Sequence, residues 1–204
     1  KLRQAMAYYY GAVTLVDDQV GKIVAALESR GWLDDSVIAF CSDHGELLGH
    51  FGMLTKSTEK YPMLYDVGLR VPLIVRSPGG QAGLVIDDPV ELIDLSPTLL
   101  ESAGLDVAEQ IQGRSLVAAL RGGPPPDRRY VFAESGEVRM IRGERYKLVD
   151  YPGQACGELY DVVADPEEMD NLYDDERHRD LRERLTHDLA EHLISIETPR
   201  RRPR

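Results

Sequence analysis

The sequence has little cysteine and no long apolar segment. Only Cys41 and Cys156 occur in 204 residues, too few for the disulfide framework of a small secreted domain. Cys41 lies within an apolar run, where we expect a small buried hydrophobic side chain. Apolar runs such as residues 71–75 are far shorter than the roughly 20 residues that a membrane-spanning helix requires. The sequence therefore predicts no structural disulfide and no membrane span.

Positive charge is also in deficit. Lys and Arg number 24 against 35 Asp and Glu, which gives a formal net charge of −11. Because nucleic acids and anionic membranes would repel such a chain, we expect neither as a partner. A local positive charge must therefore hold any anionic substrate.

A start methionine and a signal-peptide core are both lacking at the first residues. The chain opens on Lys1 and runs directly into a helical pattern, whereas a signal peptide has an apolar segment of about 7–15 residues. We expect a truncated or processed chain. The compartment therefore stays open between cytoplasm and periplasm.

The first half of the chain has the pattern of an α/β layer. Residues 5–30 carry apolar side chains at helical spacing, and Gly31 follows as a typical residue after a helix end. Residues 37–41 form a continuous apolar run, which is typical of a strand buried on both faces. Residues 71–75 predict a second strand, with Pro72 at its entry.

Two short helices and a Gly/Pro segment close this layer. Ser96 and Pro97 predict a helix N-cap and first helical residue, and residues 115–120 predict a further helix. Residues 122–126 read Gly-Gly-Pro-Pro-Pro, which is typical of a linker. The first domain is therefore expected to span residues 1–123.

A small antiparallel sheet with one terminal helix is expected over residues 124–204. The runs that predict its strands are residues 130–133, 138–142, 146–149 and 159–162. Leucines at four-residue steps between 181 and 193 predict an amphipathic helix with charges on its other face. A metal role is not expected for His178, His187 or His192 on this charged segment.

Asp43 and His44 are the candidate metal ligands. They follow the apolar run of residues 37–41, at the strand end where open α/β sheets place their ligand sites. A carboxylate oxygen and an imidazole nitrogen can both bind a divalent cation, and Gly45 lets the backbone approach it. An Asp-His pair that caps a helix or turn is the structural alternative.

Three residues in or near the following loop have expected supporting roles. Lys56 could hold an oxyanion over the strand end, although a lone loop lysine is ordinarily solvated. Glu46 is expected to orient His44 or the loop. Arg70 is expected to pair with Asp66 or a backbone carbonyl.

Five ordered segments together resemble the sulfatase family of the alkaline phosphatase superfamily. The segments are residues 9–21, residues 42–49 with Lys56, residues 70–75, residues 94–100 with 113–116, and residues 158–161 with 165–166 and 171–172. The resemblance implies the C-terminal part of an alkaline-phosphatase-like α/β/α sandwich, followed by the small sheet domain. It further implies a sulfuric ester hydrolase that acts on a small-molecule sulfate ester.

The resemblance assigns Asp43 and His44 to a divalent metal and Lys56 to the sulfate and the leaving oxygen, as a catalytic and substrate-binding group. Many sulfatases have Asn where this chain has His44, so the chain is similar to choline-sulfatase-like and phosphonate-monoesterase-like members. An imidazole nitrogen adds Mn²⁺ and Zn²⁺ to Ca²⁺ as candidate metals.

The family nucleophile is not in this sequence. Sulfatases oxidise the Cys or Ser of a C/S-x-P-x-R motif to formylglycine, and neither Cys41 nor Cys156 begins such a motif. We therefore expect formylglycine in an N-terminal half outside these residues, and an inactive chain without it. A phosphonate monoester or phosphodiester hydrolase, and a non-catalytic fragment or paralogue that packs on a partner, stay open, as does a homo-oligomer.

Overall fold

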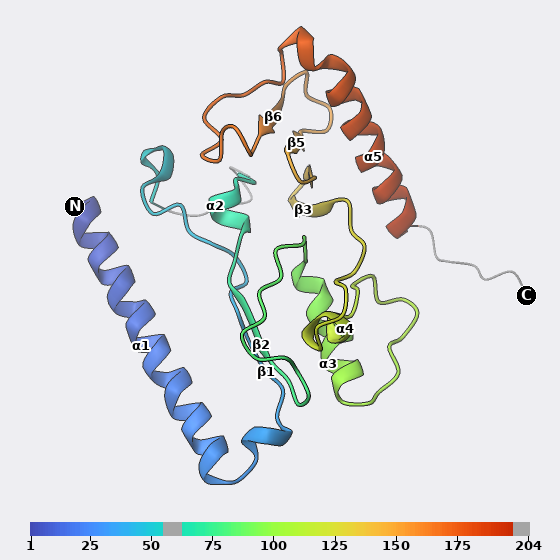
Figure 1. Ribbon diagram of the computed structural model, residues 1–204. Coiled ribbons are helices and arrows are strands. Elements are labelled where there is room, and N and C mark those ends of the chain that lie inside the picture. The colour runs from blue at the N-terminus through green and yellow to red at the C-terminus, as the bar shows by residue number, and fades with distance from the viewer. Residues whose placement is uncertain (55–62, 198–204) are drawn as a thin grey trace, which may run out of the picture.

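The computed structural model describes residues 1–54 and 63–197 (Figure 1). Helix α1 (Leu2–Ser29) runs along one side of the molecule, and its chain turns at Gly31, whose φ is 69°. This helix and its glycine end confirm the sequence prediction. α1 has no buried residue. No described helix is long and apolar enough to cross a bilayer.

Strands β1 (Ile38–Cys41) and β2 (Leu73–Arg76) form an antiparallel pair, in which Cys41 lies opposite Leu73. The prediction that β1 is buried on both faces is wrong: Phe40 is 37% exposed, and Cys41 is exposed. Among the described strands, β1 pairs with β2 alone; pairing covers an edge of a strand, whereas its faces are buried only where another layer packs on them. Cys41 and Cys156 are both free, and no disulfide joins them.

Three short helices follow β1 in the chain: α2 (Asp66–Leu69), α3 (Leu95–Ser102) and α4 (Val117–Leu120). The expectation that Ser96 caps α3 is wrong, because the helix begins at Leu95 with Asp94 as its N-cap. A 3-10 turn over Leu92–Asp94 runs directly into α3. That turn takes the place of the separate cap that the Ser-Pro pair suggests.

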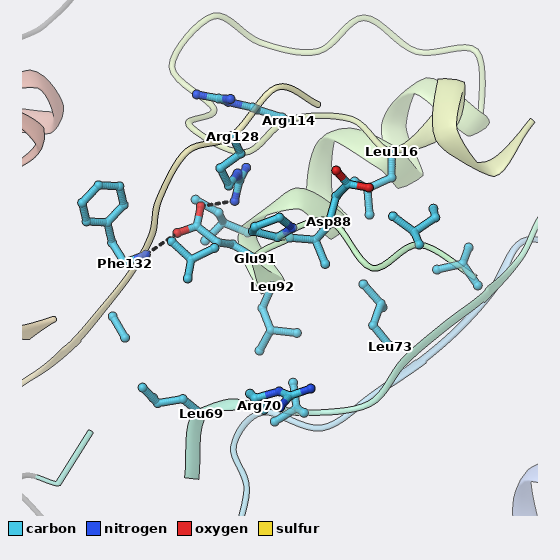
Figure 2. Close-up of a pocket in the computed structure, with 18 of the residues that line it drawn as sticks. Leu69, Arg70, Leu73, Asp88, Glu91, Leu92, Arg114, Leu116, Arg128 and Phe132 are labelled. Carbon is cyan, nitrogen blue, oxygen red and sulfur yellow. Dashed lines mark hydrogen bonds and ion pairs between the residues drawn. The ribbon is translucent and has the colours of Figure 1, made fainter. Parts of the chain in front are cut away.

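Asp94 is the centre of a buried polar network that joins the two halves of the chain. Its fully buried carboxylate accepts hydrogen bonds from the backbone N–H of Glu91 (2.8 Å) and of Arg114 (2.8 Å), and from Nη2 of Arg128 (2.7 Å). Glu91 also pairs with Arg128 and accepts from the N–H of Phe132, as Figure 2 shows. The segments around Asp94 and Arg114 therefore have a structural role.

Replacing Asp94 with Asn should lower the free energy of unfolding by about 3 kcal/mol, because it leaves the buried Arg128 guanidinium with an incomplete set of charged partners. Urea denaturation would measure the change. Asp106→Asn is the matched control: Asp106 is exposed, and surface changes of this kind stay within about 0.5 kcal/mol. Equal unfolding free energies for the two variants would contradict the structural role of Asp94.

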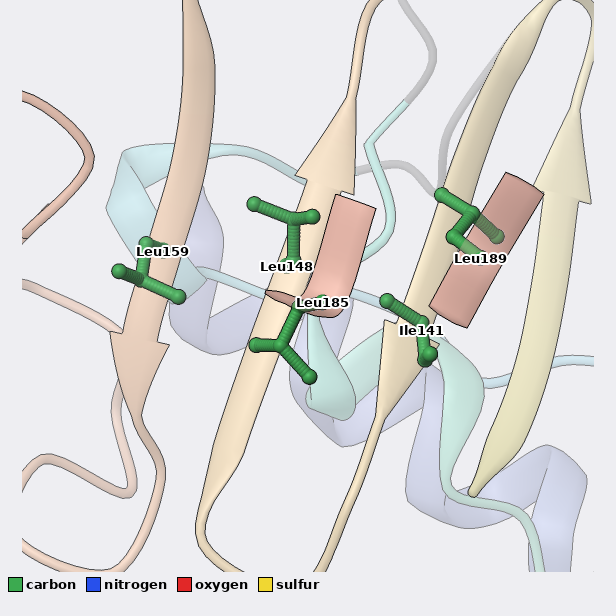
Figure 3. Packing of buried hydrophobic residues seen from close by; sticks show 5 residues of the cluster. All are labelled: Ile141, Leu148, Leu159, Leu185 and Leu189. Carbon is green, nitrogen blue, oxygen red and sulfur yellow. The ribbon is translucent and has the colours of Figure 1, made fainter. Parts of the chain in front are cut away.

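The C-terminal part is a four-stranded antiparallel meander in the order β3-β4-β5-β6. Its strands are β3 (Val131–Ser135), β4 (Val138–Arg142), β5 (Tyr146–Asp150) and β6 (Gly157–Asp161). Helix α5 (Arg179–Glu197) covers one face of this sheet. The core between them contains Ile141, Leu148, Leu159, Leu185 and Leu189 (Figure 3).

The other face of this sheet packs against the chain that leads into α2. Leu64 lies in one cluster with Val138, Met140 and Val149, whose side chains alternate with those that face α5. The sheet therefore has an apolar layer on both faces. A domain boundary near residue 123 stays a prediction, because the Asp94 network and this cluster both connect the two sides of it.

Candidate functional site

Asp43 and His44 lie directly after β1, as the sequence predicts. Their side chains turn toward each other: Nε2 of His44 is 3.3 Å from Oδ2 of Asp43. The other carboxylate oxygen, Oδ1, accepts a hydrogen bond from the backbone N–H of His44 at 3.0 Å. The pair is accessible, because the Asp43 side chain is 83% exposed and that of His44 is 40% exposed.

The tautomer of His44 follows from its second ring nitrogen. Nδ1 is 2.8 Å from the carbonyl oxygen of Gly45, which can only accept, so Nδ1 carries the hydrogen in this bond. In the neutral form of the ring, the lone pair would then lie on Nε2, which faces the Asp43 carboxylate. A backbone carbonyl commonly fixes a metal-binding histidine in this way.

The donor set of this pair fits a divalent cation. A carboxylate oxygen and an imidazole nitrogen face each other at 3.3 Å, close enough to share a proton or to bind one cation between them. No third His, Cys, Asp or Glu joins the two ligands among the described residues. Because two protein ligands seldom hold a hard cation, this pair is part of a coordination shell.

Helix α2 supports the backbone of the ligand pair. The N–H of Gly45 donates to the carbonyl of Gly68 at 2.8 Å, and a Cβ at Gly45 would lie 2.3 Å from the carbonyl oxygen of Val67. Only glycine fits this approach. No local sequence pattern signals a backbone hydrogen bond between residues so far apart, so sequence reasoning did not find it.

Two expected supporting roles have different outcomes. Glu46 bonds the loop, as one of its two expected roles states, because it accepts from the N–H of Leu47 at 3.1 Å; the group that orients His44 is the Gly45 carbonyl. The Asp66 carboxylate is held by Lys147 and Arg142, so the expected pair of Arg70 with Asp66 is wrong. That expectation placed the partner close in sequence, whereas the structure supplies it from distant strands.

Lys56, the expected substrate-binding and catalytic residue, lies outside the described residues, so its role stays a prediction. The preceding turn is described and has a strained backbone. Leu48 and Phe51 have φ values of 44° and 51°, a region that non-glycine residues seldom adopt and that occurs often at functional sites. The rings of Phe51 and Tyr65 lie 4.6 Å apart, and burial raises the pKa of Tyr65.

A wide cleft of about 2250 Å³ opens beside the ligand pair. Asp43 and His44 lie in its wall with β2, and Figure 2 shows apolar side chains such as Leu69, Leu73 and Leu92 lining it. Small-molecule pockets measure about 300–1,000 Å³. The cleft is therefore too large to be the sulfate-ester pocket by itself.

A second group of potential ligands lies on α5. His187, Asp188 and Glu191 bring one ligand atom each within 4.8 Å of one another. Asp188 already accepts a hydrogen bond from the Tyr130 hydroxyl at 2.7 Å, and the side chains of His187 and Glu191 are each 69% exposed. Solvated ion pairing explains this group, so the Asp43–His44 pair is the stronger candidate.

Comparisons with protein families place residues 1–195 among the sulfatases. The Sulfatase family model matches residues 1–105, and the model of the C-terminal region of N-sulphoglucosamine sulphohydrolase matches residues 57–195. Together the two models cover both sides of the expected domain boundary.

Individual relatives agree with this assignment. An arylsulfatase of Clostridium perfringens is 30% identical and matches 88% of this chain and 38% of its own length. A choline-sulfatase of Rhizobium meliloti is 32% identical, over 86% of this chain and 34% of its own. The phosphonate monoester hydrolase of Agrobacterium radiobacter has a TM-score of 0.78 at 32% identity, over 93% of this chain and 40% of its own.

The chain thus spans less than half the length of each of these relatives. The similarity to the solved hydrolase confirms the expected fold, which is the C-terminal part of an alkaline-phosphatase-like α/β protein with a small antiparallel sheet. On the family models and the shared fold, the chain belongs to the sulfatase family of the alkaline phosphatase superfamily.

Proposed function

We propose that these residues are the C-terminal part of a metal-dependent sulfuric ester hydrolase, in which Asp43 and His44 supply two ligands to a divalent cation. The observation that carries the proposal is the 3.3 Å approach of the imidazole Nε2 to the carboxylate Oδ2, in a chain whose family generally uses a divalent metal and formylglycine. The proposed substrate is a small-molecule sulfate ester.

The residues of this chain would act by position and charge. When bound, the cation supplies Lewis-acid polarisation of the sulfate oxygens. Asp43 and His44 hold it, with the imidazole fixed by the Gly45 carbonyl. Lys56 would place an ammonium near the leaving oxygen and neutralise the negative charge that develops there. These local positive charges offset the net charge of −11, which would otherwise repel an anionic ester.

The metal is proposed from the donor set. Ca²⁺ prefers an all-oxygen shell, whereas imidazole nitrogen suits Mn²⁺ and Zn²⁺. His44 therefore favours Mn²⁺ or Zn²⁺ over Ca²⁺.

The remaining part of the catalytic unit is proposed to cover the apolar surface of α1. Val13, Leu15, Val16 and Ile23 are each at least half exposed, and contiguous exposed apolar surface marks a contact with another layer. The greater length of the relatives favours further sequence of the same protein as this layer, which would also supply the formylglycine. A second copy of the chain is the alternative cover and would make a homo-oligomer.

A phosphonate monoester or phosphodiester hydrolase is the second candidate, favoured by His44 and by the similarity to the Agrobacterium enzyme. In the full-length protein, we expect a higher kcat/KM for 4-nitrophenyl sulfate than for a 4-nitrophenyl phosphonate monoester, measured by release of 4-nitrophenol. A higher value for the phosphonate would favour the second candidate. No turnover of either ester would favour a non-catalytic chain.

A further inference from the structure

The C-terminal sheet carries a buried lysine that the proposed chemistry does not use. Lys147 lies on β5, and its side chain is 0% exposed. Its Nζ is 3.1 Å from Oδ1 of Asp66 and 2.5 Å from Oε1 of Glu168. Because a buried ammonium is costly unless it is paired, these two carboxylates are required partners.

The network holds the first residue of α2 at three points. The backbone N–H of Asp66 donates to Oε2 of Glu168 at 2.6 Å, and Oδ2 of its carboxylate accepts from Nε of Arg142 at 3.1 Å. With the bond from Lys147, both carboxylate oxygens and the N–H of Asp66 are fixed by the C-terminal part. Two cations and two carboxylates balance in charge.

Glu168 reaches this position through an unusual backbone. Its φ is 56° and the residue is 3% exposed, so the surrounding chain must enforce a conformation that non-glycine residues seldom adopt. Asn171, three residues later, ties this segment to β6: its side chain accepts from the N–H of Leu159 and donates to the carbonyl of Gly157. Burial raises the pKa of Glu168, and the Lys147 ammonium opposes that rise.

From α2 the contact continues to the ligand pair. The Gly68 carbonyl of α2 accepts from the N–H of Gly45, and the Gly45 carbonyl accepts from Nδ1 of His44. The strained turn that contains Phe51 is tied to the segment that carries Glu168, since Nε2 of His50 is 3.2 Å from the carbonyl oxygen of Glu167. Consecutive residues, Glu167 and Glu168, therefore anchor the chain before and after residues 55–62.

We propose that Lys147, Asp66 and Glu168 are positioning residues for the metal site, which hold α2 so that the Gly45 backbone sets the orientation of the His44 ring. This proposal rests on the proposed metal site. A buried ion pair often adds little net stability compared with apolar residues of the same volume, so stability alone is a weak explanation for the three buried charges of Lys147, Asp66 and Glu168. Groups that orient metal ligands typically change metal affinity by 10–100-fold.

The test is the affinity of the full-length protein for Mn²⁺, measured by isothermal titration calorimetry at a temperature where circular dichroism shows the protein folded. Lys147→Met keeps the stem volume and removes the charge, and Glu168→Gln keeps the shape of the carboxylate. Both should raise the Kd for Mn²⁺ at least about tenfold. The control is Arg145→Met, which breaks the Arg145–Asp161 pair of the same sheet without touching α2; its Kd should equal that of the wild type.

The outcomes separate the two proposals. If the wild type binds Mn²⁺ and both variants bind it equally well, the positioning role is overturned while the metal site stands. If Arg145→Met weakens binding as much as they do, the effect follows general stability, and the positioning role is again overturned. A wild type that binds no Mn²⁺ contradicts the metal site itself. Should Lys147→Met fail to fold, Glu168→Gln decides.

Discussion

The full-length protein with Asp43→Ala and His44→Ala together should lose its metal response and at least a thousandfold in kcat. A bound cation at one hundred times its Kd stabilises the folded state by about 2.7 kcal/mol, and this gain vanishes with the ligands. Loss of Lewis-acid stabilisation of several kcal/mol accounts for the fall in rate, since each factor of ten is about 1.4 kcal/mol. Thermal unfolding with and without Mn²⁺ and steady-state kinetics would measure both effects.

A matched control for this variant exists on α5. His187→Ala with Glu191→Ala removes an exposed imidazole and carboxylate of the same types, far along the chain. Its melting temperature should still rise with Mn²⁺, and its kcat should stay near that of the wild type. If the control loses the metal response and the Asp43–His44 variant keeps it, the metal site has been assigned to the wrong pair.

Lys56→Ala in the full-length protein should lower kcat by about 10²–10³-fold with a smaller change in KM. Loss of a group that stabilises developing negative charge typically costs about 2.7–4 kcal/mol, and a group that acts mainly in the transition state affects kcat more than KM. Steady-state kinetics with 4-nitrophenyl sulfate at saturating Mn²⁺ would measure the split.

Lys60→Ala is the control for Lys56→Ala. Lys60 lies in the same segment of the sequence, and its substitution removes the same charge. We expect it to keep wild-type kcat. Equal losses for the two lysines would indicate a general electrostatic contribution of the segment rather than a specific contact. Unchanged activity of Lys56→Ala would reject its catalytic role.

The sequence predicts the helices and strands of the fold well, because their signals are local. The strand expected at residues 138–142 coincides with β4 (Val138–Arg142), and the leucines at four-residue steps place Leu185 and Leu189 in the core against the sheet. The positions of Asp43 and His44 after β1 also follow from the sequence, since the polar cluster begins where the apolar run ends. The spacing of apolar residues and the points where apolar runs end are enough to predict these features.

Tertiary partners are what local patterns do not give. A continuous apolar run predicts burial of β1, but burial depends on which layers pack on the strand, and Phe40 is exposed. Arg70 is close to Asp66 in sequence, yet the partners of that carboxylate come from β4 and β5. A lysine within the apolar run of residues 146–149 is the one sequence sign of the buried network, and its meaning depends on the distant Glu168.

The most direct test of the metal site is a crystal structure of the full-length protein grown with Mn²⁺, with anomalous scattering data collected to locate the ion. The account predicts one anomalous peak within about 2.0–2.4 Å of both a carboxylate oxygen of Asp43 and Nε2 of His44, in the range of metal–ligand bonds. A peak elsewhere, with the Asp43 and His44 side chains bonded only to each other, would contradict it.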